Sequence, residues 1–474
     1  MRIAILSILV LTALAFGQEK YAGRKLIGYV PIYNSGAPVY TLEQNIRKTD
    51  FSKLTHVIIA FVFSDSLGNI SYYGNHHSGA WSPQNTVDSI IAIARRNDTK
   101  VLISLGSDLP GWKMTLKPET RTNFVRNIKQ LMIDKGLDGL DLDLEGGWGD
   151  DAPFYYREYE LLAQELRDSL DGEFYLTAAI GFSDKSWDGK QLWTEGFVQL
   201  MDWVNIMVYD IHLWLPTAVQ NPSGMQDQIN AANLWGRFLP REKLVFGVPF
   251  YSNGWNFDND RRYAIEICWW LPTCTETSNW FPFDVFNYFV LDSLFDLAPD
   301  QDSILVTQND KLWINVAGST IGYRGSHNGI IYLNNRTLLK NKAKWAIENG
   351  YGGMMIWETG GDVPTNHPRS LLRALAEQFK ESTGEPAAIL PKQAASSQNN
   401  FTFSLQNRTL KINLENANSA EIKIIDSKGK VLYRTNQNTK SISLNLARKQ
   451  FSSGVYFLQV LQNGKAKSAK FVLR

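Results

Sequence analysis

The stretch Leu137-Asp-Gly-Leu-Asp-Leu-Asp-Leu-Glu145 decides both the fold and the chemistry that this chain can support. Side chains alternate between the two faces of a strand, so the leucines share one face and Asp141, Asp143 and Glu145 share the other. Like charges about 6 to 7 Å apart along a strand raise one another's pKa. At least one of these carboxyl groups is therefore expected to hold a proton near neutral pH, as a general acid must.

The flanking residues indicate a buried parallel strand that ends in a loop. Apolar side chains in Arg121–Lys135 recur at helical spacing, and Lys135-Gly136 is typical of a helix end. Gly146–Asp151 reads as a loop, so Glu145 lies where a β/α barrel places its chemistry, at the carboxyl end of a strand. The alternatives, a cation site or an edge strand with a solvated acidic face, fit these flanks poorly.

Residues 25–380 alternate short apolar runs with amphipathic segments, which predicts a parallel α/β fold. Eight strands are expected, the number that a closed barrel needs: Leu26–Val30, His56–Phe63, Lys100–Leu105, Gly139–Glu145, Tyr175–Ile180, Trp203–Val208, Lys243–Val248 and Gly353–Trp357. Helices are expected between them at Thr86–Arg96, Tyr155–Leu170, Met225–Phe238 and Leu338–Asn349.

The eight residues Asp138–Glu145 resemble the Asp-Gly-x-Asp-x-Asp-x-Glu signature of glycoside hydrolase family 18, the chitinase family. The resemblance implies a (β/α)8 TIM barrel and hydrolysis of β-1,4-linked N-acetylglucosamine polymers with retained configuration. It also implies that Glu145 is the general acid and base and that Asp143 orients the substrate's acetamido group. Asp141 is then expected to share a proton with Asp143, and Tyr209 to hold the acetamido oxygen.

Other segments resemble the family in the same order along the chain. They are Gly28-Tyr29, Ala60-Phe61, Ser104-Leu-Gly106, Met207-Val-Tyr209-Asp210 and the strand that ends at Trp357. Ser107 stands where the family has a second glycine, and Ser252-Asn253 stands where Gly-Arg is common. We expect substrate contacts or support of the carboxylates from Trp357, Met207, Asp210, Tyr29, Ser104, Gly106, Phe61 and the loop residue Trp148.

Two other functions remain open at this point. One is an endo-β-N-acetylglucosaminidase that acts on N-glycans. The other is a non-catalytic chitin-binding lectin, although such proteins usually lack the acid that Glu145 supplies. The aromatic-rich residues 253–331 are expected to form an α+β insertion between the seventh strand and the seventh helix. Chitinases of one subgroup carry such an insertion there as a wall of the substrate groove, which favours chitin.

The ends of the chain differ in character from the barrel. Residues 1–17 read as a signal peptide, with a retained anchor as the less favoured alternative. The expected catalytic barrel spans residues 18–383, and residues 384–400 read as a linker. Residues 401–474 alternate as strands and carry thirteen Lys and Arg against three Asp and Glu.

The C-terminal segment predicts a small all-β sandwich. It resembles the C-terminal sorting domains of the type IX secretion system, through Ile424-Ile-Asp-Ser-Lys-Gly-Lys-Val431, Ser452-Ser-Gly-Val-Tyr-Phe457 and the terminal Lys-Phe-Val-Leu-Arg. A carbohydrate-binding module is the alternative, but the segment contains no Trp and two Tyr. The resemblance implies a secreted or cell-surface protein whose partners are chitin-type oligosaccharides and secretion machinery.

Composition excludes few other classes of function. Six His and two Cys in 474 residues show no metal-ligand spacing, so no metal or other cofactor is expected. Cys268 and Cys274 are equally compatible with a disulfide and with two free thiols. No run beyond the N-terminus is long and apolar enough to span a membrane, and the charge of the C-terminal segment is not by itself a sign of nucleic-acid binding.

Overall fold

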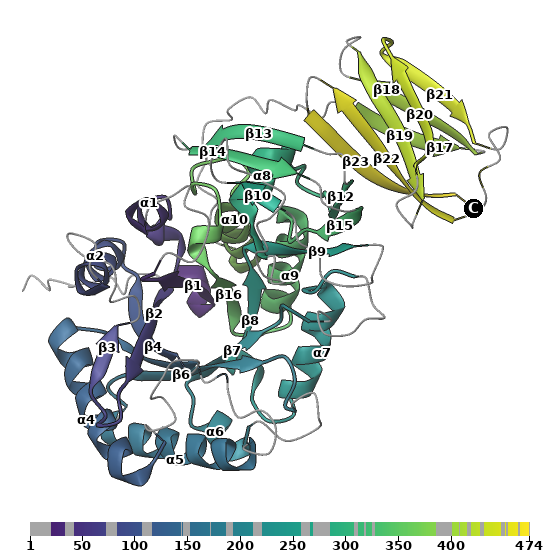
Figure 1. The fold of residues 1–474 in the computed structure, drawn as a ribbon. Coiled ribbons are helices and arrows are strands. Elements are labelled where there is room, and N and C mark those ends of the chain that lie inside the picture. The colour runs from purple at the N-terminus through teal and green to yellow at the C-terminus, as the bar shows by residue number, and fades with distance from the viewer. Residues whose placement is uncertain are drawn as a thin grey trace, which may run out of the picture.

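Eight parallel strands close into a barrel in the computed structural model of this chain (Figure 1). The structure describes residues 20–33, 42–72, 83–106, 116–143, 145, 152–170, 172–185, 193–211, 220–256, 266–268, 285–307, 311–316, 319–324, 328–384, 401–406, 408–414, 419–426, 431–446, 451, 454–462 and 465–473. The signal peptide, the linker and the loop with Trp148 that the sequence predicts lie outside these residues.

The strands of the barrel follow the order β1-β16-β8-β7-β6-β5-β4-β2, and pairing of β1 with β2 closes it. A short antiparallel strand, β3 (Ile70–Tyr72), extends β2. All eight predicted strands are present within one or two residues of the expected bounds. They are β1 (Lys25–Pro31), β2 (His56–Ser64), β4 (Lys100–Gly106), β5 (Gly139–Asp143), β6 (Tyr175–Gly181), β7 (Trp203–Met207), β8 (Leu244–Pro249) and β16 (Gly353–Trp357).

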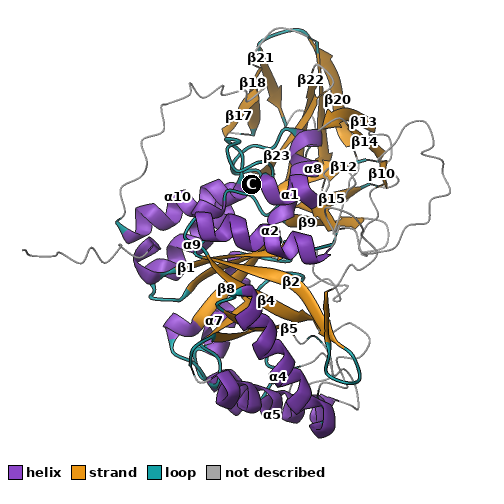
Figure 2. Ribbon diagram, turned by 90° about the vertical axis from the view of Figure 1, so that its left-hand side faces the viewer, coloured by secondary structure: helices purple, strands orange, loops and turns teal. Residues whose placement is uncertain are grey.

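Helices surround the barrel, as the two ribbon views show (Figures 1 and 2). Their ends follow local chemistry: α4 begins with a proline in its first turn and ends at Gly136, which adopts φ 62°. They are α1 (Leu42–Arg47), α2 (Pro83–Arg96), α4 (Pro118–Lys135), α5 (Ala152–Leu170), α6 (Glu195–Gln199), α7 (Met225–Trp235), α9 (Arg336–Glu348) and α10 (Leu371–Thr383). Short 3₁₀ turns accompany them at η1 (Lys20–Gly23), η2 (Phe51–Lys53), η5 (Arg241–Lys243) and η6 (Thr359–Gly361).

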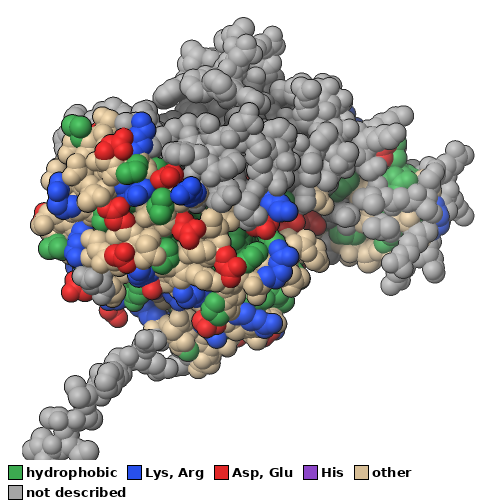
Figure 3. Space-filling model, turned by 90° about the horizontal axis from the view of Figure 1, so that it is seen from below, with side chains coloured by type: hydrophobic (Ala, Val, Ile, Leu, Met, Phe, Trp, Pro, Cys, Tyr) green, Lys and Arg blue, Asp and Glu red, His purple; other side chains and the backbone are tan. Residues whose placement is uncertain are grey.

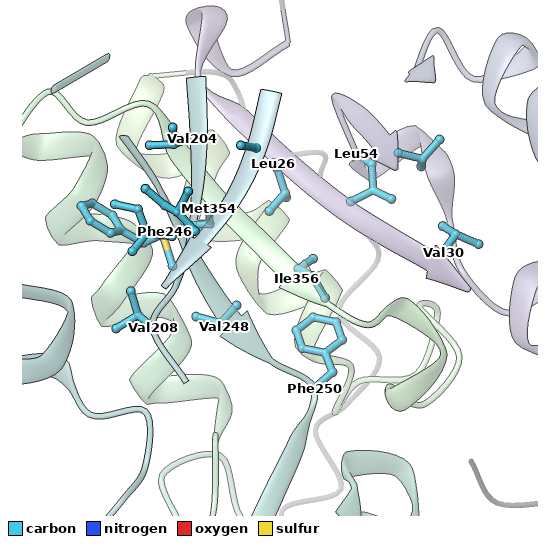
Figure 4. Packing of buried hydrophobic residues seen from close by; sticks show 14 of the residues in the cluster. Leu26, Val30, Leu54, Val204, Val208, Phe246, Val248, Phe250, Met354 and Ile356 are labelled. Carbon is cyan, nitrogen blue, oxygen red and sulfur yellow. The ribbon is translucent and has the colours of Figure 1, made fainter. Parts of the chain in front are cut away.

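The two faces of the barrel strands build two separate cores. Outward side chains pack against the surrounding helices; Figure 4 shows Val204 and Val208 of β7 and its end beside Phe246 and Val248 of β8 in this layer. Inward side chains form a smaller cluster inside the barrel. Its members are Ile27, Tyr29, Ile58, Ala60, Leu102, Trp203, Tyr209, Val245, Tyr251 and Met355. Strand alternation thus separates the residues that stabilise the barrel from those that face its axis.

On the outside of the barrel, acidic and basic side chains are intermixed. Seen from below, the described surface carries both signs without a region of one sign (Figure 3). Arg121 of α4 illustrates the pattern, because it pairs with Glu158 and Glu165 of α5, each at 2.9 Å. These pairs join two neighbouring helices of the barrel wall.

An insertion separates β8 from α9, where the sequence predicts one. It contains one described helix and two β-sheets. One sheet has the order β11-β9-β15-β12 and the other β10-β14-β13. The elements are β9 (Tyr251–Asn256), β10 (Glu266–Cys268), β11 (Val285–Asn287), α8 (Tyr288–Phe295), β12 (Ser303–Val306), β13 (Lys311–Val316), β14 (Ser319–Arg324) and β15 (Gly329–Tyr332).

The C-terminal segment forms two antiparallel sheets, β17-β18-β21 and β20-β19-β22-β23, around their own apolar core. This arrangement confirms the predicted all-β domain. Ile425 and Phe457 of this domain pack against Leu305 and Ile330 of the insertion. The strands are β17 (Phe401–Gln406), β18 (Thr409–Leu414), β19 (Ala420–Asp426), β20 (Val431–Gln437), β21 (Ser441–Asn445), β22 (Gly454–Gln462) and β23 (Lys465–Leu473).

Candidate active site

Asp141, Asp143 and Glu145 form an acidic row along and just beyond β5. The two aspartates point into the barrel, as the alternation of side chains along a strand predicts. Leu140 and Leu142 are buried on the helix side, whereas Asp141 and Asp143 face the axis. In the parallel register, Asp141 lies between a serine of β4 and a threonine of β6, and Asp143 lies level with Gly106. The strand ends at Asp143, so Glu145 stands just beyond it, exposed at the carboxyl end of the barrel.

Asp141 is fully buried and accepts hydrogen bonds from four side chains on four different strands. Oδ2 accepts from the Tyr29 hydroxyl at 2.7 Å and from Ser104 Oγ at 2.9 Å. Oδ1 accepts from Thr177 Oγ1 at 2.5 Å and from Asn205 Nδ2 at 3.2 Å. The barrel therefore holds this carboxyl group rigidly in one orientation.

Burial dominates the electrostatics of the row. It raises the pKa of Asp141, and the four hydrogen bonds act in the opposite direction because they stabilise the carboxylate. Burial, followed by the charges of Glu145 and Asp141, raises the pKa of Asp143 well above its usual range. Oδ1 of Asp143 is buried and accepts no hydrogen bond from any described residue. Of the two aspartates, Asp143 is thus the one with the greater tendency to carry a proton.

Aromatic side chains line the barrel next to this row. The Trp357 ring lies 5.4 Å from Tyr29, edge to face, and 5.7 Å from Phe61, nearly parallel. Phe61 in turn stacks on Tyr33 at 6.3 Å. A Cβ atom at Gly106 would approach Phe61 Cγ to 3.0 Å, so the glycine leaves room for this ring. Trp357 is only partly buried and is the last residue of β16, at the carboxyl end of the barrel.

Tyr209 and Asp210 follow the end of β7 on the same side of the barrel. Burial and the charge of Asp143 raise the pKa of Tyr209 well above its usual range, so its hydroxyl keeps its proton. Asp210 adopts φ 57° and accepts a 2.7 Å hydrogen bond from the hydroxyl of Tyr251. A Cβ atom at Gly247 would lie 2.6 Å from Tyr209 Cε1, so only glycine on β8 admits the tyrosine ring at this place.

The structure brings together most of the residues that the sequence singled out. Tyr29, Ser104 and Asp141 share one hydrogen-bond network, and Phe61, Met207, Tyr209 and Trp357 share one apolar cluster with Tyr29. Trp148 lies outside the described residues. Two further residues, Thr177 and Asn205, both contact Asp141 and were not predicted from the sequence. Both occupy inward positions on predicted strands. Their place in the alternation of inward and outward side chains is the signal from which they could have been predicted.

Within the described ranges, no group of three or more His, Cys, Asp or Glu side chains could hold a metal ion. The described helices also include none that is long and apolar enough to cross a membrane.

Comparisons with known proteins agree with this fold. The endochitinase of Brugia malayi is 23% identical over 367 residues, which cover 70% of this chain and 68% of that protein. Among solved structures, a chitinase from Bacteroides thetaiotaomicron matches with a TM-score of 0.57 and 20% identity, over 77% of this chain and 98% of its own. A chitinase from Cycas revoluta in complex with (GlcNAc)3 matches with a TM-score of 0.54 and 18% identity, over 74% and 99%.

Family profiles match both parts of the chain. The profile of the secretion system C-terminal sorting domain matches residues 406–474. The profile of the glycosyl hydrolases of family 18 matches residues 25–362, which include the whole barrel and the acidic row. The chain therefore belongs to glycosyl hydrolase family 18 and is a glycoside hydrolase with a C-terminal sorting domain.

Proposed function

We propose that this enzyme is a chitinase that hydrolyses β-1,4 bonds between N-acetylglucosamine units with retention of configuration. The carboxylate row and the partly exposed Trp357 support this reaction, because a sugar ring can rest on the indole while Glu145 reaches its glycosidic oxygen. The names of the matched relatives, which are chitinases, and the (GlcNAc)3 bound in the Cycas revoluta structure support the choice of substrate.

In this mechanism Glu145 donates a proton to the leaving oxygen and later accepts one from the attacking water. Its exposed position beyond β5 supports the role, because the leaving group and the water must both reach it. Asp143 binds the acetamido group of the reacting sugar and orients its oxygen toward the anomeric carbon. Asp141 shares a proton with Asp143, so that the two carboxyl groups titrate as a pair.

The nucleophile in this proposal is the acetamido oxygen of the substrate, not a carboxylate of the enzyme. The observation that carries this choice is the state of Asp143. Burial and the neighbouring carboxylates favour its protonated form, which is a poor nucleophile. Its buried Oδ1, which accepts no hydrogen bond from any described residue, can instead meet a polar group of the substrate. Family 18 is among the known exceptions to carboxylate nucleophiles in retaining glycosidases.

Tyr209 and Trp357 complete the proposed site. Because its pKa is raised well above the usual range, the Tyr209 hydroxyl keeps its proton at neutral pH and can donate a hydrogen bond to the acetamido oxygen. Trp357 supports the distorted sugar ring, and Phe61 and Tyr29 hold the indole in place from two sides. Met207 lines the same cluster, and Asp210 is held by Tyr251 at its edge.

Cleavage of the chitobiose core of N-glycans is the second candidate within this family. We favour chitin because the insertion begins directly at the site: Tyr251, the first residue of β9, contacts both Tyr209 and Asp210. The sheets that follow can extend the site along a chain of several sugar units.

The test is product analysis with chitin hexasaccharide and a high-mannose glycoprotein side by side. We expect short N-acetylglucosamine oligomers with newly formed β ends from the hexasaccharide. Release of glycans with no cleavage of the hexasaccharide would replace the chitinase proposal with deglycosylation. Binding of the hexasaccharide with no cleavage of either substrate would leave a lectin.

A fluorinated substrate tests the nucleophile separately. A trifluoroacetyl group on the reacting sugar of an aryl chitobioside withdraws electrons from the amide oxygen and should slow hydrolysis strongly. The same group on the distal sugar is the matched control and should have little effect. Equal rates for both compounds would show that the acetamido oxygen does not attack.

The ends of the chain support a proposal about where the enzyme works. We infer that residues 1–17 direct export, that the catalytic part is residues 18–383 and that residues 384–400 link it to the sorting domain. The sorting domain would then deliver the enzyme to the cell surface or the medium, where polymeric chitin is found. Retention of the protein in the cell after deletion of residues 401–474 is the expected result.

A further inference from the structure

A lysine is buried in the wall of the barrel behind the candidate active site. Lys342 lies in the middle of α9 and is fully buried, whereas two other lysines of this helix pair with surface carboxylates: Lys340 with Glu377, and Lys344 with Glu348. An ammonium group loses its hydration on burial, and a protein retains one there at a cost. In the part of the chain that the structure describes, no carboxylate lies within ion-pair distance of Lys342.

The amine of Lys342 is the first member of a chain of hydrogen bonds that leads to the site. Its Nζ donates to Ser223 Oγ at 2.8 Å, and Ser223 Oγ donates to the carbonyl oxygen of Val208 at 2.6 Å. Lys342 and Ser223 are both completely buried. One acceptor suits a neutral amine better than an ammonium, which has three hydrogens to place. Consistent with this, burial lowers the pKa of Lys342 to about 7, against the opposing effect of Asp227.

The series of hydrogen bonds ends at the peptide group that joins Val208 to Tyr209. Strand β7 ends at Met207, so the barrel ladder does not hold the Val208 carbonyl. Ser223 therefore supplies a hydrogen bond at the point where the backbone leaves the strand. A second link lies close by, because the amide of Ile211 donates to the carbonyl of Pro222 at 3.0 Å. Together these bonds tie the Tyr209 turn to the segment before α7, and Lys342 fixes that segment from behind.

We propose that Lys342 is a positioning residue for Tyr209, acting through Ser223 and the Val208 carbonyl. This inference rests on the proposed function, in which Tyr209 donates a hydrogen bond to the acetamido oxygen. The Tyr209 ring fits in a space bounded by Gly247 and packs edge to face on Tyr251 at 6.3 Å. A small shift of the turn would move its hydroxyl away from the reacting group without emptying the sugar site.

The test uses two substitutions in the chain of hydrogen bonds and one control on the same helix. Lys342→Met keeps an unbranched side chain, one heavy atom shorter, and removes the amine, and Ser223→Ala removes the hydroxyl. Lys344→Met makes the same chemical change at an exposed position. We expect kcat on chitin oligosaccharides to fall roughly ten- to a hundredfold in the first two variants, with KM changed less than about threefold. The control should match the unaltered enzyme.

A double variant tests whether the two residues act through each other. If Lys342 acts through Ser223, the Lys342→Met/Ser223→Ala double variant should lose about as much activity as Ser223→Ala alone. Multiplicative losses would show two independent effects and would overturn the proposal.

Hydrogen–deuterium exchange separates this proposal from the proposed function, because it needs no activity. Peptides that contain residues 208–211 should exchange faster in Lys342→Met and Ser223→Ala, while peptides from β1, β2 and β4 keep their protection. An enzyme inactive on chitin would remove the chitinase proposal, and the exchange result would still decide the role of Lys342. Unchanged exchange at residues 208–211, or faster exchange across the whole barrel, would overturn it.

Discussion

The Tyr29 hydroxyl donates a 2.7 Å hydrogen bond to Asp141 Oδ2 across the interior of the barrel, from β1 to β5. Both residues are buried, and the same tyrosine ring packs against Trp357 at 5.4 Å. One side chain therefore joins the acidic network to the aromatic surface on which a sugar would rest. A change at Tyr29 should affect both the charge of the row and the place of the indole.

The substitution Tyr29→Phe tests this link. It keeps the ring and removes one of the donors that stabilise the Asp141 carboxylate, so the pKa of Asp141 should rise further above its usual range. We expect kcat/KM to fall roughly tenfold and its acidic limb to move to higher pH. The control is Tyr21→Phe, which removes a hydroxyl that bonds to the Lys53 carbonyl, away from the site. An unshifted acidic limb in Tyr29→Phe would contradict the prediction.

The substitution Glu145→Gln tests the proposed general acid and base. The amide has the shape of the carboxyl group and cannot transfer the proton, so kcat should fall by about 10² to 10⁴ while oligosaccharide binding is retained. Single-turnover kinetics and calorimetric titration with a chitin oligomer measure the two effects. Glu348→Gln, at an exposed position at the end of α9, is the control. Turnover close to that of the unaltered enzyme would remove Glu145 from the mechanism.

The substitution Gly247→Ala tests the space that Tyr209 occupies. The new methyl group would lie 2.6 Å from Tyr209 Cε1 and 2.8 Å from the Ile206 carbonyl oxygen, so the ring must move. Overpacking of this kind costs about 1 to 3 kcal/mol of stability, and we expect a loss of kcat with it. Gly181→Ala, at the end of β6, meets nothing nearer than 3.4 Å and serves as the control. Equal activity of the two variants would show that the Tyr209 ring tolerates displacement.

The alternation of side chains along a strand explains why the acidic row, and the fact that it faces the barrel interior, could be predicted from the sequence. A buried parallel strand has a fixed period, so the order of residues alone assigns the leucines and the carboxylates of β5 to opposite faces. The partners Thr177 and Asn205 lie at inward positions of predicted strands as well. They were missed because threonine and asparagine carry no charge that marks them.

Lys342 could not be predicted in the same way. The run Lys340-Asn-Lys-Ala-Lys344 resembles an ordinary solvated helix surface. Which of its lysines is buried depends on how α9 packs against the neighbouring helix α7 and the segment before it, which local sequence does not encode. Tertiary placement, rather than residue type, creates the contact between Lys342 and Ser223.

Arg369 offers a test of how the insertion is fixed to the barrel. Its guanidinium bonds to Asp292 Oδ2 at 2.9 Å and to Asp296, both on the insertion at or next to α8. Asp292 is almost fully buried, and burial raises its pKa to about 6, with Arg369 acting in the opposite direction. Arg369→Met removes the cation that is hydrogen-bonded to this carboxyl group and leaves Arg336 as a nearby charge; loss of one partner of a buried pair typically costs about 3 to 5 kcal/mol.

The pH dependence of that loss follows from the direction of the shift. A carboxyl group whose pKa is raised in the folded protein reduces stability as pH rises from its usual value toward about 6. Loss of Arg369 raises the pKa further, so the unfolding midpoint of Arg369→Met should drop more between pH 5 and pH 8 than that of the unaltered protein. Arg373→Met, which breaks a surface pair with Glu377, is the control. Parallel pH profiles would show that Arg369 does not stabilise buried Asp292.

Lys342→Met should have opposite effects on stability and on activity. Because the folded pKa of Lys342 is lowered from 10.5 to about 7, the folded protein binds fewer protons than the unfolded chain between these values. Its stability therefore rises with pH in that window, and the full penalty of burying the amine is present below pH 7. Methionine carries no such penalty, so the stability of the variant relative to the unaltered protein should be about 3 kcal/mol more favourable at pH 6 than at pH 9.

Denaturant unfolding of the barrel at the two pH values measures this difference. Lys344→Met is again the control, because its amine is exposed and its removal should leave the difference between the two pH values unchanged. A variant that is more stable and less active separates a positioning residue from one that serves only the fold. Replacement of a purely structural lysine would lower both the stability and the activity of the enzyme. If Lys342→Met is destabilised equally at pH 6 and pH 9, the amine contributes to folding in its charged form, and burial does not shift its proton as the structure indicates.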